Sequence, residues 1–128
     1  MAQVKIYGLN NNIQKNRTFI SDAIHLSLQH AFELPKEKRF QRFITLSKED
    51  FIFPHDRTDQ YIIIEISVFE GRSVEAKKEL VKGIFNNLQK AGFECNDVEI
   101  TIFETQKANW GIRGISGDEL QLNYKVEV

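Results

Sequence analysis

The first half of the chain shows strand-like alternation followed by a helical spacing of apolar residues. Residues 4–7 alternate as a strand does, and Gly8 with the asparagine run 10–12 is predicted to break that strand. A helix follows, because one buried stripe recurs at helical spacing. Its members are Ile20, Ala23, Ile24, Ser27, Leu28 and Ala31. Leu34-Pro35 is predicted to end the helix, because the residue before a proline avoids helical angles, and residues 39–46 read as a second strand.

The second half repeats this order of elements after a polar and aromatic connection. Residues 61–69 have the strongest strand pattern in the sequence. Ser73 is a good N-cap for the helix that follows, and Lys90 with Gly92 is a normal helix ending. The predicted inward stripe of this helix is Ala76, Leu80, Val81, Ile84, Phe85, Leu88 and Ala91. Residues 98–104 are predicted to be the fourth main strand.

A strand-helix-strand order that occurs twice indicates a duplicated unit. The two pseudo-repeats span about residues 2–48 and 61–108 of a single domain, 1–128. Each crossover is expected to be right-handed and to place its two strands parallel. The predicted fold class is therefore α+β, built from duplicated β-α-β units, with a mixed four-stranded sheet and both helices on one face.

The other face of the sheet is predicted to be covered by a second copy of the chain. Residues 63, 65, 67 and 69 of the third strand point away from the helices and are part apolar and part polar, as are residues 99, 101 and 103. Such a face is too apolar for bare solvent, and no third helix is available to cover it. The tail, 109–128, ends in the alternating residues Leu120, Leu122, Tyr124, Val126 and Val128. They predict a strand that adds to a neighbouring subunit.

The charge and composition of the chain limit the kinds of partner and the locations that we expect for it. The chain has 17 basic and 18 acidic residues, a net charge of -1, and no isolated basic block, so no nucleic-acid partner is predicted. No segment approaches the length needed to cross a bilayer, and the N-terminus has no long apolar run typical of a signal peptide. Cys95 is the only cysteine, which excludes an intramolecular disulfide and favours a reducing, cytoplasmic location.

Two short motifs are candidates for chemistry. Arg72 lies in a Glu-Gly-Arg-Ser turn just before a helix, where it either holds a carboxylate or is a solvated turn residue. Trp110 precedes Gly-Ile-Arg-Gly, and it either lines a small-molecule pocket with Arg113 or simply packs. The three histidines are dispersed, and neither a metal site nor a cofactor is predicted.

Taken together, these motifs resemble the tautomerase superfamily, the family of 4-oxalocrotonate tautomerase and macrophage migration inhibitory factor. The stretches VFEGRS, DVEITIFET and KANWGIRG look like one complete small subunit of that family, and the first half is similar to a diverged copy. The whole chain resembles the fused, double-length bacterial members. The resemblance implies a β-α-β-β-α-β subunit that forms a homotrimer, with the sheets lining its centre.

The resemblance also implies a chemistry. In the family an N-terminal proline acts as general base, arginines hold substrate carboxylates, and an aromatic side chain keeps the pocket dry. Arg72 and Trp110 match the family's turn arginine and pocket aromatic. Arg39, Arg42 and Arg113 are further substrate-binding candidates without a clean motif match.

Three departures from the family pattern affect the expected activity. Ala2 stands in place of the proline, Glu99 in place of a strand arginine, and the asparagines 10–12 in place of a first-half turn. The α-amine of Ala2 could still act as a base if Met1 is removed. The sequence therefore predicts an altered or weakened keto–enol activity on a small carboxylate. The alternatives are a non-catalytic carboxylate-binding or structural trimer and a ferredoxin-like regulatory domain.

Overall fold

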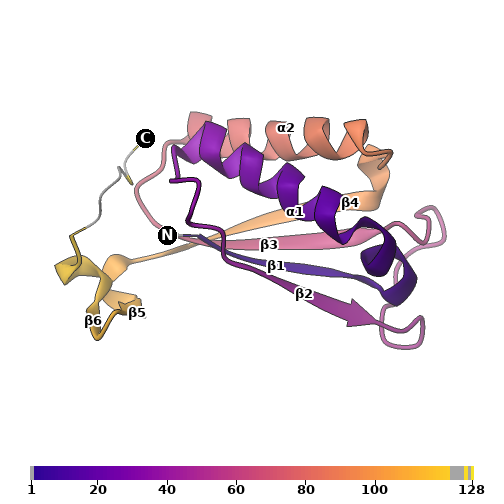
Figure 1. The fold of residues 1–128 in the computed structure, drawn as a ribbon, viewed down its shortest axis with the longest axis horizontal. Coiled ribbons are helices and arrows are strands. Elements are labelled where there is room, and N and C mark those ends of the chain that lie inside the picture. Colours follow the sequence, from indigo (N-terminus) through magenta and orange to yellow (C-terminus); the bar gives the residue numbers. More distant parts are fainter. Residues whose placement is uncertain (1, 122–125, 127) are drawn as a thin grey trace.

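A mixed four-stranded sheet forms the centre of the molecule, and two helices lie side by side on one of its faces (Figure 1). The computed structural model describes residues 2–121, 126 and 128. Its main elements are β1 (Ala2–Leu9), α1 (Asn10–Phe32), β2 (Gln41–Leu46), β3 (Ile62–Phe69), α2 (Val74–Lys90) and β4 (Val98–Thr105). Short 3-10 turns (Cys95–Asp97, Lys107–Asn109, Gly117–Glu119) and a small hairpin, β5 (Gly111–Ile112) with β6 (Ile115–Ser116), follow α2. The predicted fold class is confirmed.

The strand order β2-β1-β3-β4 brings four chain segments together at one end of the sheet. Both pairs within a half, β1 with β2 and β3 with β4, are parallel as predicted, whereas the central pair β1 and β3 is antiparallel. In that central pair Ala2 lies opposite Val68. The starts of β1 and β2 and the ends of β3 and β4 therefore meet at what we call the Ala2 end of the sheet.

The core lies between the sheet and the helices and follows the alternation of β3. Ile62, Ile64, Ile66 and Val68 are fully buried under the helices, as the pattern predicts. The burial of aliphatic side chains on the central strands is the main force that holds the two halves together. Four residues of the predicted buried stripes are only partly buried: Ala31, Val81, Phe85 and Ala91.

Helix α1 begins earlier than its sequence predicts. Gly8 stays within β1, and the asparagines 10–12 form the first helical turn instead of a break. The buried Asn12 explains this, because its Nδ2 donates to the carbonyl of Gln60 at 2.9 Å and its Oδ1 accepts from Asn16 at 2.8 Å. A Cβ on Gly8 would come within 2.7 Å of the Ile13 side chain, so this glycine serves close packing.

The face of the sheet opposite the helices is covered at both ends by the chain itself, so the predicted second copy has only the middle of this face to cover. Far from Ala2, Phe51, Phe53 and Tyr61 of the β2–β3 connection pack together over that face. At the Ala2 end, Trp110 packs on Phe69. The middle stays more open, because Arg42 and Thr101, which are in register with Lys5 and Glu65, are both exposed.

Only part of the predicted terminal strand falls on described residues. Leu120 directly follows a 3-10 turn, whereas Leu122 and Tyr124 lie outside the described residues. Val126 packs with Phe69 of its own chain. The placement of the tail on a neighbouring subunit stays a prediction. Neither α1 nor α2 is long and apolar enough to cross a membrane, and the same holds for every helix in the described part of the chain.

Candidate functional site

The Ala2 end of the sheet gathers three of the residues singled out in the sequence. Ala2 is 3% exposed and begins the central strand β1 beside the end of β3. The β3–α2 turn follows immediately, and Gly71 has a φ of 129°, a value that favours glycine. The start of β1, this turn and the β5–β6 hairpin all lie at the same end of the molecule in Figure 1.

Arg72 is a buried arginine and not a solvated turn residue. It is 5% exposed, and its Nη1 donates to the carbonyl oxygen of Phe69 at 3.3 Å. Its guanidinium carbon lies 4.8 Å from the ring centroid of Phe32, the last residue of α1. A cation over an aromatic face is stabilised by the ring quadrupole, more strongly when water is excluded. The two phenylalanines therefore hold the guanidinium at the Ala2 end.

The start of α2 is already capped by the chain. The Ser73 hydroxyl accepts a hydrogen bond from the backbone N–H of Ala76 at 3.1 Å, which confirms its predicted role as N-cap. The same hydroxyl donates to the backbone oxygen of Val128 at 2.8 Å. An anion bound at this turn would therefore rely on the Arg72 guanidinium more than on the helix N-terminus.

Trp110 forms the outer wall of this end. Its ring meets that of Phe69 edge-on, with centroids 4.8 Å apart and planes at 65°. Ile112 and Val126 complete the cluster around Phe69. Residues 108–116 line an open hollow of about 580 Å³ that includes both Trp110 and Arg113.

Gly117 holds the Trp110 segment against the sheet, and its substitution by alanine is expected to loosen this wall. A Cβ there would lie 2.7 Å from the backbone oxygen of Lys107 and 3.0 Å from the Phe69 ring. Backbone cannot yield as a flexible side chain does, so we expect a loss of about 1–3 kcal/mol of unfolding free energy. The emission of Trp110, the only tryptophan, should shift to the red.

Chemical denaturation followed by tryptophan fluorescence measures both effects of Gly117→Ala. Gly111→Ala is the matched control, because a Cβ at Gly111 meets nothing within 4 Å. Equal stability and equal emission of the two variants would contradict this account of the packing.

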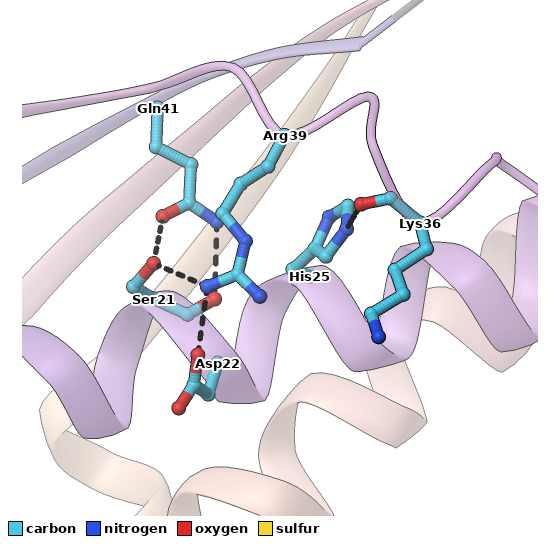
Figure 2. A network of polar contacts seen from close by, with 6 residues as sticks. All are labelled: Ser21, Asp22, His25, Lys36, Arg39 and Gln41. Atoms are coloured by element: carbon cyan, nitrogen blue, oxygen red, sulfur yellow. Dashed lines mark hydrogen bonds and ion pairs between the residues drawn. The ribbon is translucent and has the colours of Figure 1, made fainter.

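The three other candidate arginines occupy three different places in the fold. Arg39 is held on the flank of α1, where its Nη1 lies 2.7 Å from Asp22 and 3.0 Å from the Ser21 hydroxyl (Figure 2). Arg42 is exposed on the open face, in register with Lys5. Arg113 is exposed at the tip of the β5–β6 hairpin, with a φ of 55°.

A second polar cluster occupies the open face and the opposite end of the sheet. Tyr7 donates to Glu65 at 3.0 Å, and this hydrogen bond raises the pKa of Tyr7. Tyr61 donates to Glu99 at 3.2 Å, and burial, followed by the nearby charge of Glu99, raises the pKa of Tyr61. Glu99 is therefore engaged with a tyrosine at the end of the sheet remote from Arg72.

Sequence reasoning missed Phe32 and Phe69 as parts of this site. Phe69 was expected on the face opposite the helices, where it lies, but its contact with Trp110 joins segments 41 residues apart in sequence. Phe32 follows Leu28 by one helical turn, so the apolar spacing along α1 could have predicted its burial. Its contact with Arg72 could not have been predicted in this way. Among the described residues, no group of three or more His, Cys, Asp or Glu side chains could hold a metal ion.

A family model, a sequence relative and two solved structures all relate this chain to tautomerases and proteins of similar fold. The model of a family described as "Tautomerase enzyme" matches residues 38–113. The 2-hydroxymuconate tautomerase of Comamonas testosteroni is 39% identical over 57 residues, which cover 44% of this chain and 90% of that one. FG41 malonate semialdehyde decarboxylase, in a crystal structure inhibited by 3-bromopropiolate, is 27% identical with a TM-score of 0.74, covering 85% and 87% of the two chains. A fused 4-OT described as a symmetric trimer is 15% identical with a TM-score of 0.76, covering 91% and 96%.

Proposed function

Because the chain belongs to the tautomerase family, we propose that it binds a small carboxylate at the Ala2 end of its sheet and catalyses keto–enol tautomerisation there. The activity is altered or weakened relative to relatives that carry an N-terminal proline, since Ala2 occupies that position. The first substrate to test is 2-hydroxymuconate, an enol dicarboxylate, because the related protein is a 2-hydroxymuconate tautomerase.

The observation that carries this proposal is the convergence of Ala2, Arg72 and Trp110 around the end of β3. Ala2 lies opposite Val68, Arg72 donates to the Phe69 carbonyl, and Trp110 packs on the Phe69 ring. A base position, a buried cation and an aromatic wall at one place are the parts that proton transfer next to a carboxylate needs. The first two are nearly water-free, which strengthens their electrostatic effects.

Each residue has a distinct role in the proposed reaction. Arg72 binds the substrate carboxylate and stabilises negative charge on the enolate oxygen. The α-amine of Ala2, free once Met1 is removed, takes the enol O–H proton and leaves an enolate. The oxygen's electron pair then forms the carbonyl while the C=C electron pair takes a proton from the Ala2 ammonium at carbon, so that the amine returns to its original state. Trp110 limits the access of water to these steps.

We propose that three copies associate through the open middle of the sheet. That face carries the Lys5–Glu65 pair, whose charged atoms are 3.8 Å apart, and the half-exposed Phe103 two residues nearer the Ala2 end. The trimer described for the fused 4-OT supports this assembly. In the trimer that we propose for this chain, part of the C-terminal tail also packs on a neighbouring subunit, beside its contacts with Phe69 and Ser73 of its own chain. Arg42 and Arg113, both exposed, then complete a partner's site.

The alternative is a non-catalytic carboxylate-binding or structural trimer on the same fold. The pairing of Glu99 with Tyr61 favours it, because this position holds a hydrogen-bonded acid where the resemblance implies a substrate-binding arginine. In this case Arg72 still binds an anion, but no proton is transferred.

A ketonisation assay combined with calorimetry separates the two functions. Tag-free protein is mixed with 2-hydroxymuconate or an enol pyruvate, and loss of the enol absorbance is compared with the rate in buffer. Our proposal expects catalysed loss that saturates with substrate. Heat of carboxylate binding without any rate above buffer would instead establish the alternative, and absence of both would refute binding at Arg72.

A further inference from the structure

An apolar groove of about 600 Å³ lies between the outer side of α2 and the edge strand β4, and it runs from Val74 at the start of α2 to Cys95 beyond the end of that helix. Its apolar lining includes Val74, Val81, Phe85 and Ile102. Val74 is 57% exposed, and Val81 and Phe85 are stripe residues that the core leaves only partly buried. The volume falls within the range of about 300–1,000 Å³ typical of small-molecule sites.

The charge along the rim of this groove is positive. Lys77, Lys78 and Lys82 line it, and no acidic residue does. Lys77 is neutralised by Glu104 at 2.8 Å. Lys78 and Lys82 form no ion pair with any described residue, and both are exposed. An apolar floor with two such ammonium groups at its rim suits a ligand with an alkyl chain and one anionic head.

We propose that the α2–β4 groove binds a soluble single-chain fatty carboxylate, with its chain along Val81 and Phe85 and its head near Lys78 and Lys82. Charge complementarity selects this occupant over a neutral or cationic amphiphile. The groove is lined mainly by side chains of α2, which lies on one face of the sheet, so the proposed association of copies through the opposite face would leave it open. The lining of the groove contains none of Ala2, Arg72 and Trp110, and the proposal does not depend on tautomerase activity.

Cys95 provides a direct probe, because it lines the groove, is exposed and is the only cysteine of the chain. The rate of its reaction with a coloured thiol reagent is measured on the native protein with hexanoate, octanoate or decanoate below their micelle concentrations. We expect decanoate to slow the reaction about fivefold at saturation. Each added CH₂ should tighten binding about two- to fourfold until the groove is filled. Acetate, which has the same head and no chain, should give no protection.

Charge variants test the head group. The double variant Lys78→Glu/Lys82→Glu should weaken decanoate binding at least about fivefold, both in the protection assay and in titration calorimetry. Lys15→Glu on α1 is the matched control, because it is an exposed lysine outside the groove, and it should leave the affinity unchanged. All of these lysines are exposed, so the variants should keep the thermal midpoint of the parent.

Several results would overturn the proposal. If decyltrimethylammonium protected Cys95 as well as decanoate does, Lys78 and Lys82 would not bind the head group. If protection of Cys95 did not depend on the chain length of the carboxylate, the apolar groove would not bind the alkyl chain. Failure of decanoate to protect Cys95 and to bind in calorimetry would refute it outright. A Cys95 that reacts only after dilution dissociates the protein would show that a second copy covers the groove. Binding confined to anionic vesicles, with none to decanoate, would assign the surface to a membrane.

Discussion

Replacing Arg72 with alanine will lower kcat/KM for an enol carboxylate by at least about 100-fold, because the substrate loses its anion partner and the enolate loses a stabilising charge. The same variant should bind the carboxylate too weakly to detect by calorimetry. The guanidinium is buried, donates to Phe69 and lies over Phe32, so some loss of stability is also expected. Steady-state kinetics and a thermal melt of the same sample separate the two effects.

Arg17 offers a matched control for that substitution. Its guanidinium carbon also lies near a phenylalanine ring, 5.8 Å from the centroid of Phe43, but it is exposed on α1. Arg17→Ala should keep both activity and carboxylate binding. Arg72→Lys adds a second test, since it retains a charge without the planar donor fork and should recover only part of the binding. An unchanged rate in Arg72→Ala would remove this residue from the site.

Protein that keeps Met1 will turn over at least about 100-fold more slowly than protein whose first residue is Ala2. In the first form the nitrogen of Ala2 belongs to a peptide bond and cannot act as a base, and general base catalysis contributes roughly 10²–10⁴-fold. The two forms can be made by different processing of one leader and distinguished by intact mass. With Ala2 free, kcat/KM should rise with pH as the amine loses its proton.

Carboxylate affinity serves as the internal control for the N-terminus. Arg72 is present in both forms, so a substrate analogue should bind each with similar affinity, and only turnover should differ. Equal rates in the two forms would exclude the Ala2 amine as the base and leave the non-catalytic function as the better account. Ala2→Pro, which restores the family's residue, should in turn raise the rate of the processed form.

The sequence was most informative where the fold repeats simple periods. Alternation in β3 predicted which side chains face the helices, and Ile62, Ile64 and Ile66 are buried there. The crossover rule predicted the two parallel pairs. The same reasoning was wrong at the start of α1, because the hydrogen bond from Asn12 to Gln60 joins residues 48 positions apart. A local propensity for turns could not reveal that partner.

The candidate site shows the same division. Arg72 and Trp110 were singled out from short motifs, yet the sequence left open whether either was solvated or buried. Arg39, Arg42 and Arg113 looked equivalent to each other, and only the structure separates one held by Asp22, one on the open face and one at a hairpin tip. Val81 and Phe85 of the α2–β4 groove were likewise predicted to lie in the buried core, but they are only half-buried. Helical periodicity does not show how far the sheet extends beneath a helix.

By itself, the sequence determined the elements of this protein, the inward faces of its central strands and its family, because these depend on local periodicity and on contiguous motifs. Only the tertiary structure decided that Ala2 pairs with Val68 while Arg72 and Trp110 both contact Phe69, and that Glu99 lies at the other end of the sheet with Tyr61. The physical reason is that strand register and the closing of loops set contacts between residues far apart in the chain. The free energy of those contacts comes from packing and burial in three dimensions, which no short window of sequence contains.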